Sequence, residues 1–419
     1  MKWLDILLRS AWHRRGTLSL AVLSIALSVF LLLGVERLQQ AARESFTQSV
    51  SGTDLVVGAR TSPVQLMLYA VFRLGEPTNN MDWQSYQKLA QHPAVAWTIP
   101  LSLGDSHRGF AVLGTNQDYF RHFRYADKRP LVFAAGKPFN DVFEAVIGAD
   151  VAAKLGYKLG QNIALTHGSG ALNLPEHADK PFRVVGILQR SGTPVDRTVH
   201  VNLAAIEAIH LDWQGGAPLP GFSIPAQYVK KFDLTPKQIT ATLVGLKSRG
   251  GVFRMQRFVN NYRDEPLVAV MPGVALDQLW QLLAVAEQTL RMISLLVLAT
   301  GFCGMIAVVL ASLNERRREL AILRSVGAGA STVLGLLMAE GTLLLLAGCA
   351  LGAASLWLAC FAAAPLLEAR FGVIVPLLPL SLNEARWLGI IIAAGALASL
   401  LPGWRAYRLS LADGLSARI

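Results

Sequence analysis

Long apolar stretches along this chain are separated by segments in which apolar and polar positions are mixed. Four long stretches are mainly apolar: residues 17–45, 276–313, 331–361 and 387–404. Each holds a run close to the length that a helix needs to cross a bilayer. In the first two stretches a helical pattern extends beyond that run, through Leu38 and Phe46 in one and Leu276 and Trp280 in the other. We expect these extensions to pair as a two-helix stalk, or else to pack as ordinary helices on a soluble domain.

The segment between the first two apolar stretches, residues 46–275, has a mixed pattern. Strand-like runs occur at 111–113, 182–188, 198–201 and 239–244, and helical patterns lie at 82–91, 149–155 and 203–209. The sequence therefore predicts an α-helical membrane protein with four transmembrane helices and a large α+β extracytoplasmic domain between helices 1 and 2. Residues 362–386 are expected to form a loop between helices 3 and 4, and residues 405–419 a cytoplasmic tail.

The first 16 residues place apolar and charged side chains on opposite helical faces, which predicts an amphipathic helix lying in the membrane interface. A cleaved signal peptide is the competing interpretation. It is disfavoured because the apolar run that follows is long enough to span and lacks a small-residue cleavage site.

Residues 314–330 form a charged segment between the second and third apolar stretches. Leu320, Leu323 and Val326 recur at helical spacing and Gly327 ends the pattern. The segment is thus predicted to be a short amphipathic helix that docks on another protein. Its polar side is formed by six charged residues, Glu315, Arg316, Arg317, Arg318, Glu319 and Arg324. The alternative is a basic loop that only anchors the two flanking spans.

Composition and charge narrow the class of protein. Of the 419 residues, 53% are hydrophobic and 16% are charged, which excludes a purely soluble protein. The net charge of +11 does not indicate nucleic-acid binding, because the prominent arginines cluster at the ends of the apolar runs. Their distribution places both termini and residues 314–330 in the cytoplasm and the large domain outside. All three cysteines, Cys303, Cys349 and Cys360, lie in apolar runs, so no disulfide framework is available.

The segment from Glu315 to Ala328 resembles the cytoplasmic signature of the FtsX/MacB/lipoprotein-release (LolC/LolE-like) family of ABC transporter permeases. The order Glu-Arg, Glu-Leu, Leu-Arg and Gly-Ala matches throughout. Residues 132–209 are similar to the β-rich insertion of the MacB-like periplasmic core, and 401–415 to the family's closing motif. The tail departs from that motif at Gly403, Trp404 and Leu411.

The resemblance implies a permease in the bacterial inner membrane that works as a homodimer with two copies of a separate ABC ATPase. The residues implied to contact that ATPase are Glu315, Arg316, Glu319, Leu320, Leu323, Arg324, Val326 and Gly327. A periplasmic adaptor or binding protein is a further implied partner, and membrane lipid surrounds the helices. ATP and Mg²⁺ would bind the ATPase and no cofactor would bind this chain, whose sequence contains no phosphate-binding loop and no catalytic motif.

Two functions agree with these features. The first is coupling of ATP hydrolysis to motion of the periplasmic domain, for export, extraction or mechanotransmission of an unidentified substrate. The second is ATP-driven regulation of a periplasmic enzyme, such as a cell-wall hydrolase, without transport. The size of the outer segment favours the first.

Three further sets of residues are candidates for function. Met67, Tyr69 and Phe72 follow a turn at Ser62 and Pro63 and form an apolar stripe, either a substrate or partner surface or part of a core. Glu340 lies about two turns into the third span. It is either a functional intramembrane carboxylate or a carboxylate that pairs with an arginine or reaches the membrane interface.

Two histidines, His167 and His177, are the third candidate set. They share a polar stretch with Glu176 and Asp179 and are weak metal-ligand candidates. Their spacing matches no standard site, so we expect a solvated loop there and no metal. A G-x-x-x-G at Gly348 and Gly352 predicts close helix packing.

Overall fold

The computed structural model describes residues 15–168, 177–214, 217–219, 223–315, 322, 325, 327–371 and 380–408. The chain divides into two compact units. A helical unit contains Met1–Ala41, Ala284–Leu367 and Val375–Ile419, and an outer unit contains Ala42–Leu283 and Glu368–Ile374. Two of the boundaries fall inside the long helices α2 (Arg15–Gln48) and α10 (Pro272–Glu315), and another falls near the end of α12 (Ala330–Phe371).

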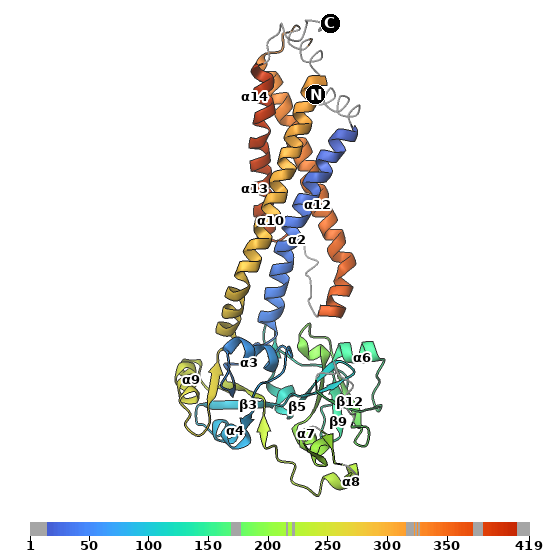
Figure 1. The fold of residues 1–419 in the computed structure, drawn as a ribbon, viewed down its shortest axis with the longest axis vertical. Helices are drawn as coiled ribbons and strands as arrows, with labels where there is room; N and C mark the ends of the chain where they lie inside the picture. The colour runs from blue at the N-terminus through green and yellow to red at the C-terminus, as the bar shows by residue number, and fades with distance from the viewer. Residues whose placement is uncertain are drawn as a thin grey trace. The chain divides into compact units, whose positions relative to one another are not determined.

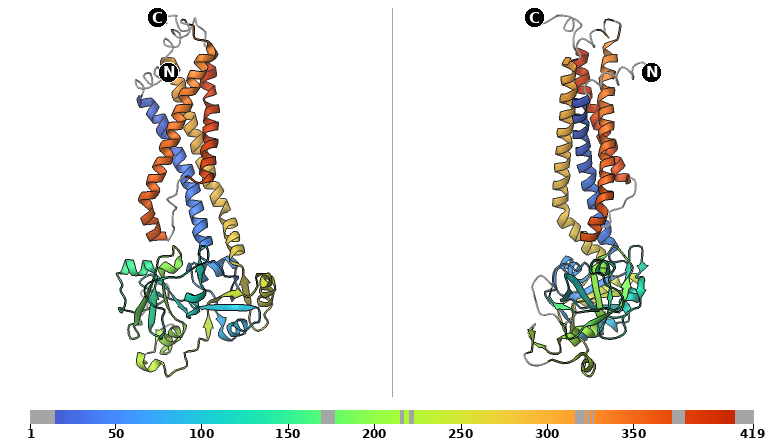
Figure 2. Two further views of the ribbon diagram at one scale, coloured as in Figure 1. Left: turned by 180° about the vertical axis from the view of Figure 1, so that it is seen from behind. Right: turned by 90° about the vertical axis from the view of Figure 1, so that its right-hand side faces the viewer.

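The helical unit is built from α2, α10, α12 (Ala330–Phe371), α13 (Leu382–Ala398) and α14 (Leu400–Arg408). The first four lie side by side in Figures 1 and 2. Among the described residues, four segments are long and apolar enough to cross a membrane: Arg15–Glu44, Pro272–Ala311, Ser331–Leu366 and Leu382–Arg405. The prediction of four transmembrane helices is therefore confirmed.

Close packing of α12 on α2 depends on two glycines. A Cβ on Gly348 would lie 2.7 Å from Ile25 Cβ, and one on Gly352 would lie 2.6 Å from the carbonyl oxygen of Ala26. Both distances are too short for real atoms, so any larger residue would push the helices apart. The G-x-x-x-G of the sequence therefore lies at a helix–helix contact.

Residues 362–386, predicted to be a loop, are helical at both ends. Helix α12 continues to Phe371, because alanines and leucines dominate its last turns and favour the helix even around Pro365. Helix α13 begins at Leu382 with a capping box, in which the Ser381 hydroxyl accepts from the Glu384 amide and the Glu384 carboxylate accepts from the Ser381 amide.

The outer unit contains two principal sheets (Figures 1 and 2). Among the described residues the first has four antiparallel strands in the order β18-β1-β17-β3. They are β1 (Leu55–Ala59), β3 (Val95–Leu101), β17 (Ala241–Leu246) and β18 (Leu267–Val270). Val56 belongs to one buried cluster and its neighbours Leu55 and Val57 to another. Both faces of this sheet are therefore covered, by elements that include α3 (Pro63–Ala70), α4 (Trp83–Ala90) and α9 (Val252–Asn260).

The second sheet has eight strands among the described residues, in the order β10-β12-β9-β13-β5-β4-β11, with β8 beside β12. The strands are β4 (Asp105–His107), β5 (Phe110–Thr115), β8 (Phe133–Gly136), β9 (Glu144–Ile147), β10 (Asn162–Ile163), β11 (Thr166–His167), β12 (Phe182–Leu188) and β13 (Thr198–Asn202). The pairs β5–β13 and β9–β12 are parallel and the other pairs antiparallel. Helix α6 (Ala149–Leu155) connects β9 to β10, and helix α7 (Leu203–His210) follows β13.

This second sheet differs in extent from the predicted β-rich region at 132–209. The sheet also includes β4 and β5, which precede residue 132. Strand β5 belongs to it because it pairs in parallel with the whole of β13, from Ala111 opposite Thr198 to Thr115 opposite Asn202. The smaller elements are β2 (Met81–Asp82), β6 (Arg124–Tyr125), β7 (Arg129–Pro130), β14 (Trp213–Gln214), β15 (Ala217–Pro218), β16 (Gln238–Ile239), α5 (Asp118–His122), α8 (Ala226–Val229) and two 3₁₀ turns at Pro194–Arg197 and Arg249–Gly251.

The ends of α2 and α10 that belong to the outer unit contact each other. The rings of Phe46 and Trp280 have centroids 5.7 Å apart, and the Arg43 guanidinium lies 5.3 Å from the Trp280 ring. Such aromatic and cation–π contacts hold two helices together beyond the effect of apolar burial. These are the residues that the helical pattern placed in a stalk.

Candidate functional site

Most of the predicted ATPase-contacting segment lies outside the described residues. This applies to Arg316, Glu319, Leu320, Leu323, Arg324 and Val326. Glu315 is the last residue of α10, and Gly327 has a φ of +99°, a backbone conformation that favours glycine. Helix α12 begins three residues later at Ala330. Gly327 is the residue at which the amphipathic pattern of residues 314–330 ends in the sequence.

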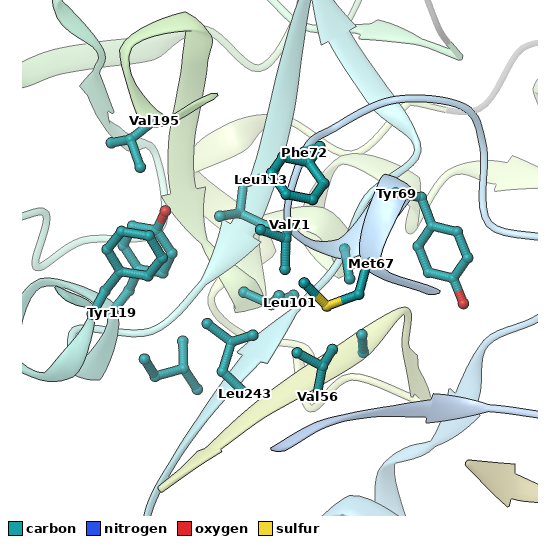
Figure 3. Close-up of a cluster of buried hydrophobic side chains, with 14 of the residues drawn as sticks. Val56, Met67, Tyr69, Val71, Phe72, Leu101, Leu113, Tyr119, Val195 and Leu243 are labelled. Carbon is teal, nitrogen blue, oxygen red and sulfur yellow. The ribbon is translucent and has the colours of Figure 1, made fainter. Parts of the chain in front are cut away.

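The apolar stripe at Met67, Tyr69 and Phe72 lies in the core of the outer unit. All three side chains are buried in one cluster with Val56 and Leu101 (Figure 3). Of the two interpretations that the sequence left open, the structure places these residues in the core. They do not form an open apolar surface.

Tyr69 also lines a cavity of about 380 Å³, together with Arg73 and Asp105. Burial raises the pKa of Tyr69 to about 12, so its phenol stays protonated at neutral pH.

Polar residues are also buried in the helical unit. Glu340 on α12 is buried, and its role as a functional carboxylate remains a prediction.

Arg37 on α2 binds Glu384 at the start of α13, with Nε 2.7 Å from Oε1 and Nη2 2.9 Å from Oε2. A bidentate pair of this kind fixes the relative orientation of two helices. Sequence reasoning missed it because 347 residues separate its members.

The structure brings both candidate histidines together with two residues that the sequence did not single out. One ligand atom from each of Asp105, His167, His177 and His210 lies within 4.8 Å of every other. Asp105 and His167 are direct cross-strand partners on β4 and β11. His210 ends α7, and His177 is held beside β11 by its amide, which donates to the Leu165 carbonyl at 2.8 Å.

The four side chains differ in their exposure. The side chains of His167 and His210 are 36% and 27% exposed and that of Asp105 only 3%, whereas His177 is fully buried. The expectation of a solvated loop is therefore wrong for His177. Of the two neighbours named with them, Glu176 lies outside the described residues, and Asp179 accepts a hydrogen bond from Lys180 at 3.1 Å.

Electrostatics separate the two predicted histidines. The hydrogen bond to Asp105 raises the pKa of His167 despite partial burial. Burial, followed by the neighbouring His210, lowers the pKa of His177 to about 4. At neutral pH the His177 imidazole is accordingly uncharged, which is the form that can ligate a metal.

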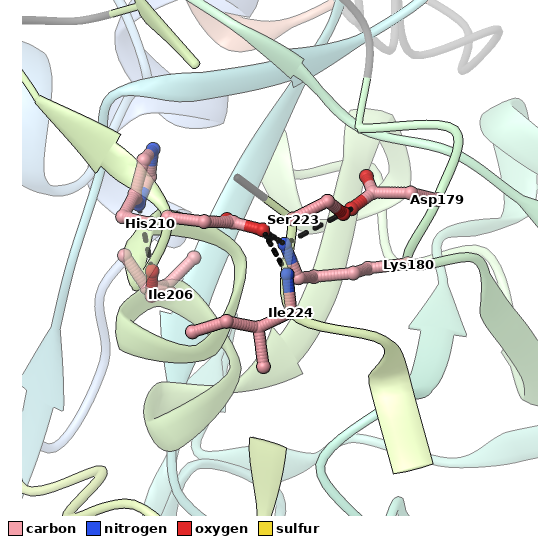
Figure 4. Close-up of polar contacts among 7 residues, drawn as sticks. Asp179, Lys180, Ile206, His210, Ser223 and Ile224 are labelled. Atoms are coloured by element: carbon pink, nitrogen blue, oxygen red, sulfur yellow. Dashed lines mark hydrogen bonds and ion pairs between the residues drawn. The ribbon is translucent and has the colours of Figure 1, made fainter. Parts of the chain in front are cut away.

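A buried ion pair fixes the chain on both sides of this cluster (Figure 4). Lys180, three residues after His177, donates to both carboxylate oxygens of Asp212 at 2.6 and 2.7 Å. Burial alone would raise the pKa of Asp212, but Lys180 and the Ile224 amide outweigh burial and hold it below its usual range. Since Asp212 follows His210 by two positions, the pair ties the His177 segment to the end of α7.

Sequence reasoning missed Asp105 and His210 because nothing near them in the sequence resembles a ligand motif. The strand β4 has only three residues, and its partner strand β11 lies about sixty residues further along the chain. His210 ends a helix whose buried residues, Leu203, Ala205, Ala208 and Ile209, are all apolar. The clustering therefore depends on tertiary pairing.

Family comparisons agree with this architecture. The MacB-like periplasmic core domain matches residues 18–229, half of the chain, and the FtsX-like permease C-terminal domain matches residues 291–411. A search of curated proteins found no match.

Two solved structures are similar to part of the chain. The crystal structure of the periplasmic region of MacB from Actinobacillus actinomycetemcomitans is 9% identical with a TM-score of 0.35, over 55% of this chain and 94% of that one. The extracellular domain of the noncanonic ABC-type transporter YknZ from Gram-positive bacteria is 13% identical with a TM-score of 0.29, over 52% of this chain and 98% of that one. The first match covers most of α2 and the outer unit as far as α8, and the second begins within α10 and includes the last two membrane-spanning helices. On these two matches the chain belongs to the FtsX/MacB family of ABC transporter permeases.

Proposed function

We propose that this chain is a homodimeric permease that transmits ATP-driven motion of two separate ATPase subunits to its outer domain. It lies in the bacterial inner membrane, with both termini in the cytoplasm and the outer domain in the periplasm. Arginines near the termini and within residues 314–330 support this orientation, because positively charged residues are retained on the cytoplasmic side. The moved substrate is taken from the membrane or the periplasm.

The observation that carries the proposal is the amphipathic segment at residues 314–330, between two membrane-spanning helices of a chain from this family. Helix α10 runs unbroken from Pro272, in the outer unit, to Glu315, where that segment begins. A displacement of the segment is therefore passed along a single helix. Leu320, Leu323 and Val326 would fill a groove on the ATPase, and the charged residues would form the rim.

The test is co-purification of the cognate ATPase with chain variants from detergent-solubilised membranes. Truncating central apolar anchors of an interface usually costs more than about 1 to 2 kcal/mol each. Leu320→Ala combined with Leu323→Ala should therefore remove the ATPase from the complex or leave it bound without coupling.

Arg317→Ala is the matched control in the same segment. As a rim charge it should mainly make the association more sensitive to salt. If the double alanine variant binds the ATPase and supports coupled turnover at the wild-type level, the segment is only a membrane anchor and the proposal fails.

A further inference from the structure

We propose that the outer domain binds one divalent transition-metal ion of the Zn²⁺ class through Asp105, His167, His177 and His210. The proposal goes beyond the permease function and does not depend on it. Three imidazoles and one carboxylate form a ligand set that suits Zn²⁺ and its neighbours, whereas Ca²⁺ and Mg²⁺ require mainly oxygen ligands.

The spacing of the ligand atoms fits a tetrahedral ion. Nδ1 of His167 lies 3.1 Å from Oδ1 of Asp105 and 3.2 Å from Nε2 of His210, and the latter atom lies 3.8 Å from the same oxygen. Neighbouring ligands of a tetrahedral Zn²⁺ with bonds of about 2.0–2.1 Å are about 3.3 Å apart. Three of the four ligand atoms thus already have the separations of a coordination shell.

His177 supplies the second, independent observation. Its ring is fully buried, yet neither ring nitrogen has a hydrogen-bond partner among the described residues. Leaving a buried polar atom unpaired costs roughly 1–3 kcal/mol. A metal ion in the cluster would give one of these nitrogens a bond, whereas hydrogen bonding within the cluster leaves both without one.

The surroundings set the form of the ligands. Nδ1 of His210 donates to the Ile206 carbonyl at 2.7 Å (Figure 4), which leaves Nε2 as the lone-pair nitrogen that faces the cluster. Asp105 contributes a nearly buried negative charge. Trp213 covers His177, with ring centroids 4.2 Å apart, and limits the movement of that imidazole.

The site is reached from a cavity of about 410 Å³, which Asp105, His167, His210 and Glu207 help to line. With four protein ligands a tetrahedral ion keeps no open position for water, so the geometry points to holding the ion and not to hydrolysis. The Lys180–Asp212 pair then acts as outer support, because it fixes the segments that carry His177 and His210.

The first experiment uses the full-length chain in detergent, with any affinity tag removed and metal stripped by a chelator. Calorimetric titration with Zn²⁺ should give one ion per chain, and Co²⁺ should give the intense visible absorption of a tetrahedral complex. Excess Mg²⁺ or Ca²⁺ should displace neither the bound Zn²⁺ nor the bound Co²⁺.

Variants identify the ligands. His177→Leu keeps an apolar group of similar size in the buried position, so the variant should fold, and without metal it should be at least as stable as the wild type. It should lose more than about 100-fold in Zn²⁺ affinity, beyond what loss of an outer-shell partner costs. His210→Leu should show the same loss, and His92→Leu, at a histidine outside the cluster, should bind Zn²⁺ like the wild type.

Three results would overturn the proposal. One is the absence of Zn²⁺ binding by the wild type, which would leave the cluster as a hydrogen-bond network only. Another is wild-type affinity in both folded variants, His177→Leu and His210→Leu. The last is a Co²⁺ spectrum of octahedral type that the two substitutions leave unchanged. Loss of affinity in a folded His177→Leu variant, with retention in His92→Leu, supports the assignment.

Discussion

Buried histidines of the outer domain show how one residue type takes different roles in one fold. His107 satisfies both ring nitrogens, with the Ala164 carbonyl at 2.6 Å and the Tyr157 hydroxyl at 2.9 Å. His200 contacts the Val146 carbonyl at 3.3 Å, and its Nε2 has no partner among the described residues. His177 has no partner for either nitrogen within the same part of the chain. Only the first is an ordinary, fully bonded core histidine.

His200 should make the stability of the outer domain depend on pH. Burial, with Arg73 as the second cause, lowers its pKa from 6.5 to about 3. Between these two pH values the unfolded state binds a proton at His200 and the folded state does not. The contribution of the neutral His200 to the unfolding free energy is therefore full above pH 6.5 and is lost as the pH falls towards 3. We expect His200→Leu to make the decline of the unfolding free energy shallower by up to about 1.4 kcal/mol per pH unit in this window.

The measurement is chemical unfolding followed by tryptophan fluorescence at pH 7, 6, 5 and 4, in the presence of a metal chelator. His92→Leu, outside this core, should keep the wild-type slope. Equal slopes in His200→Leu and the wild type would show that His200 does not resist protonation.

Sequence patterns found residues whose environment is local and missed those whose partners are distant. His167 and His177 stood out because they share one polar stretch. Asp105 and His210 join them only after β4 pairs with β11 and α7 packs against the sheet. Arg37 lies in the first apolar stretch, residues 17–45, and Glu384 in the predicted loop, residues 362–386. Neither sequence neighbourhood shows the other member of the pair.

Elements with a regular pattern were predicted well. Strands β12 and β13 and helices α6 and α7 appear where alternation or helical spacing placed them, since each pattern comes from burial of one face. The loop predicted at residues 362–386 was too long at both ends. Its first part lacked a stop signal apart from Pro365, and the Ser381–Glu384 capping box is a start signal that the sequence does contain.

At the scale of elements, we predict that Gly352→Ala destabilises the packing of α12 on α2. The added Cβ would lie 2.6 Å from the Ala26 carbonyl oxygen and 2.9 Å from Val29 Cβ, and overpacking of this kind costs typically 1–3 kcal/mol. Gly335→Ala on the same helix is the matched control, because nothing lies within 4 Å of its added Cβ. Alanine there should be neutral or stabilising.

Thermal denaturation of both variants in the same detergent checks this prediction. Gly352→Ala should melt at a lower temperature than the wild type, and Gly335→Ala should not. A Gly352→Ala protein as stable as Gly335→Ala would mean that the two helices do not approach as closely as described.

At the scale of the whole molecule, the two family matches cover different parts of the chain. The MacB-like core match covers the two sheets up to α8, and the FtsX-like match begins within α10 and reaches past α14. The division points at residues 41/42 and 283/284 fall inside the continuous helices α2 and α10. Both helices therefore continue from the helical unit into residues of the outer unit, and this is the connection that the proposed transmission of motion uses.

Pulsed electron spin resonance between labels on the two copies tests that transmission most directly. Cys303, Cys349 and Cys360 are first replaced by alanine, and Lys158→Cys, an exposed position of the outer unit, carries the label. The chain is reconstituted in lipid nanodiscs with its ATPase. We predict that the distance distribution changes when ATP and Mg²⁺ are added, and that Leu320→Ala with Leu323→Ala abolishes the change. A distribution that stays the same while the bound ATPase hydrolyses ATP, or a change that persists in the double variant, would contradict the proposal that residues 314–330 couple the ATPase to the outer domain.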